Sequence, residues 1–95
     1  MNLKVSELRA IVNRLFTYLE ETGRSEFEIS EDYYWFIEED EVYDPLKEPK
    51  ALTMGQLSDD WNELSDILKG ESPPIGYAFV WLSAILRIVG EKSVY

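Results

Sequence analysis

The chain has 95 residues, 19 acidic and 9 basic side chains, and a formal net charge of −10. It contains no cysteine and no histidine, which excludes disulfides, thiolate nucleophiles, Ser-His-Asp machinery and metal sites built on those ligands. We therefore expect one non-catalytic domain spanning residues 1–95, without a cofactor or a specific metal site, in the reducing setting of the cytoplasm.

The first predicted element is an amphipathic helix over residues 7–22. Ser6 is placed to act as its N-cap, and Gly23 is placed as the residue that follows its C-terminal end. The apolar residues between them recur at helical spacing and form one stripe: Leu8, Ile11, Val12, Leu15, Phe16 and Leu19.

Residues 24–50 show strand-like and loop-like patterns rather than helical ones. Phe27 and Ile29 alternate with polar residues, and residues 33–37 are a run of aromatic and β-branched side chains. These two stretches predict a hairpin that turns at residues 30–32, or else one extended aromatic segment that lies on the helices. Two prolines make residues 38–50 a loop.

The second predicted helix covers about residues 54–69. Thr53 and Gln56 have the spacing of a capping box, and Gly70 follows the last apolar residue. One face of this helix carries Met54, Leu57, Trp61, Leu64 and Leu68.

The third predicted helix covers residues 75–89 and follows two prolines, which a first helical turn tolerates. It is apolar on nearly every side until Gly90, and it is shorter than the roughly 20 residues that a membrane span requires. We expect a buried position for it, and no membrane association. Its small residues, Gly76 and Ser83, share a stripe on which another helix could approach closely, either the first helix of the same chain or a helix of a second copy.

These elements predict a mainly α fold with a minor β part. Three helices would form the domain, with a short β-hairpin or an extended aromatic segment between the first and the second. The residues expected to build its core are Leu8, Ile11, Val12, Leu15, Leu19, Leu57, Trp61, Leu64, Leu68, Phe79, Leu82, Ile85, Leu86 and Val89.

The negative charge is concentrated in the middle of the chain, together with many aromatic side chains. Residues 1–19 sum to +2 and residues 49–95 to −2, whereas residues 20–48, with twelve acids and two bases, sum to −10. If residues 33–37 form a strand, alternate side chains point to opposite faces, so at least two large ones are exposed or are covered by something else. The candidate partner-binding residues are Tyr33, Tyr34, Trp35, Glu38, Glu39, Asp40, Glu41, Tyr43 and Asp44.

The functional hypothesis is an acidic protein-binding module, such as an adaptor, an inhibitor or an immunity-like protein. Its segment 26–48 would engage a basic protein, for example a nucleic-acid-binding protein or a toxin-like enzyme. Direct nucleic-acid binding is disfavoured, because the chain repels phosphates. Two alternatives remain open: the acids form a solvated loop over a core of aromatics, or the protein is a structural homodimer that associates through helix 75–89 and carries its charge for solubility.

Enzymatic and cation-binding roles have weak support. Nineteen acidic residues make some carboxylate pair inevitable, so such a pair does not by itself indicate hydrolysis. The Asp-x-Asp-x-Asp-Gly spacing of a calcium loop is absent, and no glycine lies between Gly23 and Gly55.

Overall fold

The computed structural model describes residues 1–36 and 53–94. Within these ranges it contains three helices and one two-stranded antiparallel sheet. The elements are α1 (Val5–Glu21), β1 (Tyr33–Phe36), β2 (Thr53–Gln56), α3 (Leu57–Leu68) and α4 (Ala78–Val94). The predicted fold, mainly α with a small β part between the first two helices, is confirmed.

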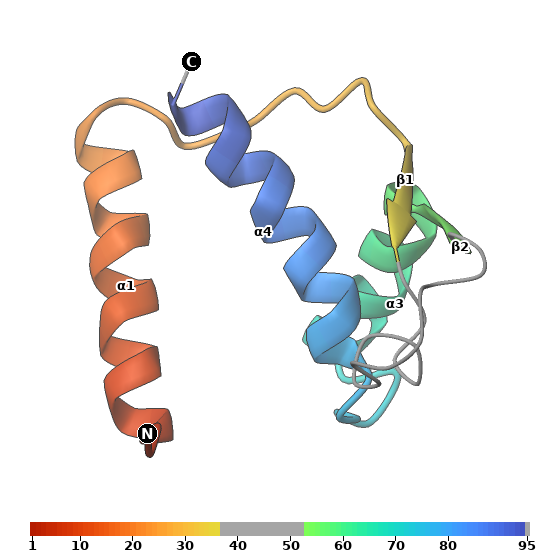
Figure 1. The fold of residues 1–95 in the computed structure, drawn as a ribbon, viewed down its shortest axis with the longest axis horizontal. Coiled ribbons are helices and arrows are strands. Elements are labelled where there is room, and N and C mark those ends of the chain that lie inside the picture. Colours follow the sequence, from red (N-terminus) through yellow and green to blue (C-terminus); the bar gives the residue numbers. More distant parts are fainter. Residues whose placement is uncertain (37–52, 95) are drawn as a thin grey trace.

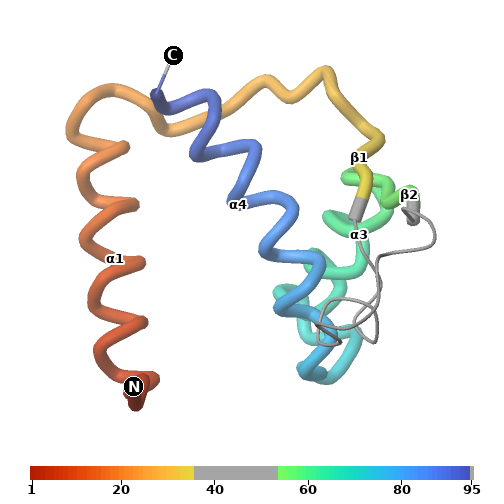
Figure 2. Tube along the Cα trace, in the orientation of Figure 1, coloured from red at the N-terminus to blue at the C-terminus, as the bar shows by residue number. Residues whose placement is uncertain are grey.

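Helix α4 lies in the middle of the arrangement (Figure 1). Helix α3 packs against α4, and the two strands pair beside α3. Helix α1 stands on the other side of α4, and the linker formed by residues 22–32 passes the C-terminal end of α4 on its way to β1 (Figure 2). The chain therefore forms a packed part, made of α3, α4 and the sheet, and a separate arm, α1.

Helix α1 begins two residues earlier than predicted, and Ser6 lies inside its first turn. Lys4 occupies the N-cap position without a side-chain capping bond. The C-terminal end of α1 was predicted correctly. Gly23 has a φ of +83°, its amide donates to Glu20 O, and the Arg24 amide donates to Leu19 O at 2.8 Å. This pair of bonds is a Schellman motif, which needs a left-handed residue that glycine supplies without strain.

The hairpin pairs different segments from those predicted. The partner of β1 is Thr53–Gln56, in a register that places Tyr34 opposite Gly55 and Trp35 opposite Met54. Residues 26–30 are not a strand. Phe27 and Ile29 are nevertheless half-buried while their polar neighbours are exposed, so the alternation reflects docking of an extended linker on the helices instead of a β-ladder.

Helix α3 begins at Leu57, because residues 54–56, predicted as its first turn, and Thr53, predicted as its cap, form β2. The capping box is therefore wrong: Gln56 is at the N-cap position and its side chain does not cap the helix. Gly70 ends α3 as predicted, with a φ of +78° and the same two-bond motif that ends α1.

Helix α4 is displaced toward the C-terminus relative to the prediction. Residues 75–77 form a tight turn before it, and Gly90 lies inside the helix, which continues to Val94. Gly90 has no positive φ, so it is an ordinary helical residue and not a C-terminal stop.

The predicted core is confirmed in part: Leu57 is buried, and six other predicted core residues are half-buried, namely Leu19, Leu64, Leu82, Ile85, Leu86 and Val89. Of the described residues, the structure buries only Leu57, at 4% exposure, and Asp60, at 7%. Leu15 in the α1 stripe remains 57% exposed, and Trp61, Leu68 and Phe79 are also exposed. The stripe was identified correctly, but Leu8, Ile11, Val12, Leu15 and Phe16 remain exposed, and of its residues Leu19 is half-buried.

Candidate protein-binding surface

The outer face of the hairpin carries three large exposed side chains. Tyr33 is 63% exposed and Trp35 is 59% exposed, and Met54, which pairs with Trp35 across the sheet, is exposed beside it. Side chains alternate along a strand, so Tyr33 and Trp35 point away from the face on which Tyr34 lies. The expectation that at least two aromatics of this run are exposed is therefore confirmed. We call Tyr33, Trp35 and Met54 the aromatic face.

The inner face of the hairpin is fixed by Tyr34. Its ring lies over Gly55, where a Cβ would come within 2.6 Å of the Tyr34 Cε2 and hydroxyl oxygen, so only glycine leaves room for it. The Tyr34 hydroxyl donates a short hydrogen bond to Oδ2 of Asp60, the buried carboxylate in the first turn of α3. Burial first, and then the Asp60 carboxylate, raise the pKa of Tyr34 above its ordinary value of 10.0. Tyr34 thus holds the sheet on α3, which sets it apart from its exposed neighbours.

Asp32 joins the linker, the sheet and α3 at one point. Its Oδ2 accepts a hydrogen bond from Gln56 Nε2 at 2.7 Å, and its Oδ1 accepts one from the Ser58 amide at 2.8 Å. Its backbone carbonyl accepts a third from the Leu57 amide at 2.6 Å. The bond from Gln56, followed by that from Ser58, lowers the pKa of Asp32 below 3.8. Asp32 therefore caps α3 from a distant part of the sequence, in place of the predicted Thr53.

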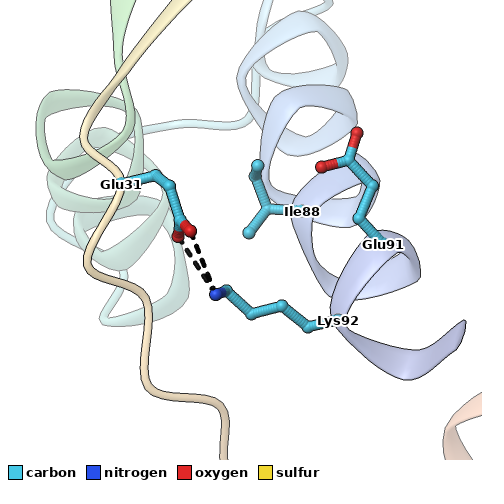
Figure 3. Close-up of a pocket in the computed structure, with 4 residues that line it drawn as sticks. All are labelled: Glu31, Ile88, Glu91 and Lys92. Atoms are coloured by element: carbon cyan, nitrogen blue, oxygen red, sulfur yellow. Dashed lines mark hydrogen bonds and ion pairs between the residues drawn. The ribbon is translucent and has the colours of Figure 1, made fainter. Parts of the chain in front are cut away.

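The linker is also tied to the C-terminal end of α4. Arg24 Nη1 donates to the backbone oxygen of Ser93 at 2.5 Å and to that of Lys92 at 3.4 Å. These carbonyls are at the end of the helix, where the macrodipole favours a cation. Lys92 Nζ in turn lies 3.1 Å from Oε2 of Glu31, and Figure 3 shows the two side chains meeting across the gap between linker and helix. A hydrogen bond from its own backbone, and then Lys92, lower the pKa of Glu31 below 4.5.

The remaining candidate residues lie outside the described part of the chain. These are Glu38, Glu39, Asp40, Glu41, Tyr43 and Asp44. They follow β1 in the sequence, so the strand that carries Tyr33 and Trp35 immediately precedes the most acidic part of the chain.

A second exposed surface, which the sequence did not indicate, lies between α1 and α4. It is a groove of about 290 Å³ whose lining is almost entirely apolar. Phe16, Leu86 and Val89 line it and also line an adjoining hollow of about 700 Å³, which extends to Leu57 and Trp61 on α3. The amphipathic pattern of α1 predicted a buried face but not that this face would border an open groove.

Across residues 1–36 and 53–94, no helix has the length and apolarity needed to cross a bilayer. In the same two ranges, acidic side chains do not gather in groups of three or more that could hold a metal ion. Comparison with known proteins finds no matching protein family, no matching curated protein and no matching solved structure.

Proposed function

We propose that the protein is a non-catalytic binding module that engages a basic protein partner through its aromatic face and the acidic residues of segment 26–48. The observation that carries this proposal is the exposure of Tyr33 and Trp35 on one face of a sheet whose other face is anchored by Tyr34. Tyrosine, tryptophan and methionine are enriched at protein interfaces, and tryptophan and tyrosine often contribute most of the binding energy.

The charge distribution supports a basic partner. Segment 20–48 carries a net charge of −10, and Glu28, in the linker, is exposed. A concentration of carboxylates accelerates encounters with a cationic surface and disfavours acidic competitors. A basic nucleic-acid-binding protein or a toxin-like enzyme has a surface of this kind. The lack of cysteine fits a reducing compartment, which we propose to be the cytoplasm.

The rigid mounting of the aromatic face supports the same function. Tyr34, Gly55 and Asp60 fix the hairpin on α3, and Asp32 fixes its approach from the linker. Side chains held on an anchored sheet lose little conformational entropy when a partner binds, which favours affinity.

The test is affinity capture from lysate of the source organism with the full chain as bait. Capture is repeated at about 0.1 M and about 1 M salt, between which the screening length falls from ~10 Å to ~3 Å. A basic protein that is retained at low salt and released at high salt is then purified and titrated against the bait.

Three variants of the bait decide the assignment. Tyr33→Ala with Trp35→Ala removes the aromatic anchors, and conversion of Glu38, Glu39, Asp40 and Glu41 to their amides removes charge. The matched control is Phe79→Ala, because Phe79 is 76% exposed and belongs to α4 instead of the sheet. The proposal requires that both test variants lose the partner and that the control keeps it. Equal binding by all variants, or no salt-sensitive partner, would refute it.

A further inference from the structure

The apolar stripe of α1 and the groove beside α4 are both open to solvent, and only part of the stripe lines the groove. The stripe residues Leu8, Ile11 and Leu15 are all exposed. Helix α1 lines the groove together with α4 through residues between Val12 and Leu19, and its residues before Val12 are not part of the lining. The N-terminal half of α1 projects away from the packed part of the chain (Figure 1).

The chain exposes more surface than a compact monomer of the same mass. A compact protein of 11.1 kDa exposes about 5,700 Å², whereas this chain exposes 8238 Å². Its radius of gyration is 15.4 Å, against about 12 Å for a compact chain of this length. The surplus of roughly 2,500 Å² exceeds the ~800 Å² that each partner contributes to an interface of standard size.

The charges around the two surfaces are complementary. With about 3.6 residues per turn, the exposed Arg9 borders one edge of the α1 stripe, and residues 1–19, which contain the stripe, sum to +2. The hollow that continues the groove has an apolar floor, but Glu26, Glu31 and Asp32 of the linker also line it. An apolar helix face in a segment of net positive charge therefore fits an apolar groove whose adjoining hollow carries carboxylates.

We propose that the groove takes α1 of a second copy of this chain. Exchange is reciprocal, so the protein is a two-fold symmetric dimer in which the two α1 helices lie between the two α4 helices. This is a four-helix arrangement, and it covers on both copies the stripe that the single chain leaves exposed. The contact is independent of the aromatic face, which remains available to another partner.

The first test measures the oligomeric state of the full chain by sedimentation equilibrium at low and at high salt. The expected species has twice the 11.1 kDa mass of the chain, and it persists at high salt because apolar contacts are not screened. The test variant is Leu15→Glu, which puts a charge in the middle of the stripe and should weaken the dimer by about 100-fold or more.

The matched control is Thr17→Glu, which adds the same charge to the exposed opposite face of α1 and should leave the dimer intact. Tyr33→Ala with Trp35→Ala should also leave it intact, so failure of the dimer and failure of the partner-binding proposal are distinguishable. A chain that is monomeric at all concentrations, or one that responds equally to both glutamates, would overturn the inference.

The second test asks whose α1 occupies the groove. Since the chain has no cysteine, single cysteines can be placed at will. Val12→Cys and Leu86→Cys, made in separate chains and mixed under oxidising conditions, should form a disulfide-linked pair of chains. A single chain that carries both Val12→Cys and Leu86→Cys should not form an internal disulfide, because α1 of the second copy lies between these two positions. The reverse pattern would show that α1 closes on its own α4, and would overturn the inference.

Discussion

The contact between Tyr34 and Asp60 gives the sharpest test of how the hairpin is held. Tyr34→Phe removes one hydroxyl and leaves the Asp60 carboxylate, which is 7% exposed, without that donor. A hydrogen bond to a charged group contributes about 1.5–3 kcal/mol, so we expect an equal loss in the free energy of unfolding. The matched control is Tyr33→Phe: its hydroxyl belongs to an exposed side chain, so the change should stay within about 0.5 kcal/mol.

Urea unfolding followed by far-ultraviolet circular dichroism, at one fixed protein concentration, measures both variants. With a slope of roughly 1–2 kcal/mol per molar urea, the midpoint of Tyr34→Phe should fall by about 1–2 M. Asp60→Ala completes a double-mutant cycle, in which the double variant should lose less than the sum of the single losses by about 1 kcal/mol or more. A Tyr34→Phe variant as stable as Tyr33→Phe, or additive losses in the cycle, would refute the anchoring role of this contact.

Three further predictions follow from the pKa values and the glycines. Burial raises the pKa of Tyr34 above 10.0. The stability that depends on its neutral form is therefore fully present below pH 10 and is lost as the pH rises above that value. Urea midpoints in alkaline buffers should fall less for Tyr34→Phe than for wild type. Hydrogen bonds lower the pKa of Asp32 below 3.8, so its stabilisation is present above pH 3.8 and is lost as pH falls through the lowered value. Asp32→Ala should therefore lower the urea midpoint at neutral pH, and the difference from wild type should vanish in strong acid. Gly90→Ala should raise the melting temperature of the dilute chain by the equivalent of about 0.5–1 kcal/mol, whereas Gly70→Ala, at a φ of +78°, should lower it; changes of the same sign would contradict a helix that continues through Gly90.

The sequence predicted features that depend on neighbouring residues. The C-terminal ends of α1 and α3 were predicted from Gly23 and Gly70, because a left-handed residue at that position is a local requirement. The exposure of two aromatics in β1 was predicted from strand alternation alone.

The start of α3 was not predictable in this way. Its cap is Asp32, which accepts a hydrogen bond from the Ser58 amide 26 residues later in the chain. No local sequence pattern connects these two residues. The same holds for β2: Thr53 and Gln56 have the spacing of a capping box, but pairing with β1 and the fit of Tyr34 over Gly55 determine their conformation. Long-range contacts decided between two local possibilities that the sequence allowed equally.

The α1 stripe shows a different limit of sequence reasoning. Helical periodicity predicts that a face will be buried, but the pattern is the same whether the covering surface belongs to the same chain or to another. Within one chain, Leu15 stays 57% exposed, so the pattern that predicted a core is better explained as an interface.

The strong acidity of the chain opposes nonspecific association of its exposed apolar surfaces. A protein that exposes an apolar stripe and an aromatic face is prone to nonspecific association, and a high net charge of one sign opposes it through mutual repulsion. Repulsion of this kind would also oppose a dimer, unless the contact is apolar and the opposing charges near it are paired. Residues 1–19, which sum to +2, contain the whole α1 stripe, and three carboxylates of the linker line the hollow that adjoins the groove that we propose it enters. The charge pattern therefore disfavours contact between copies in general while permitting it through α1.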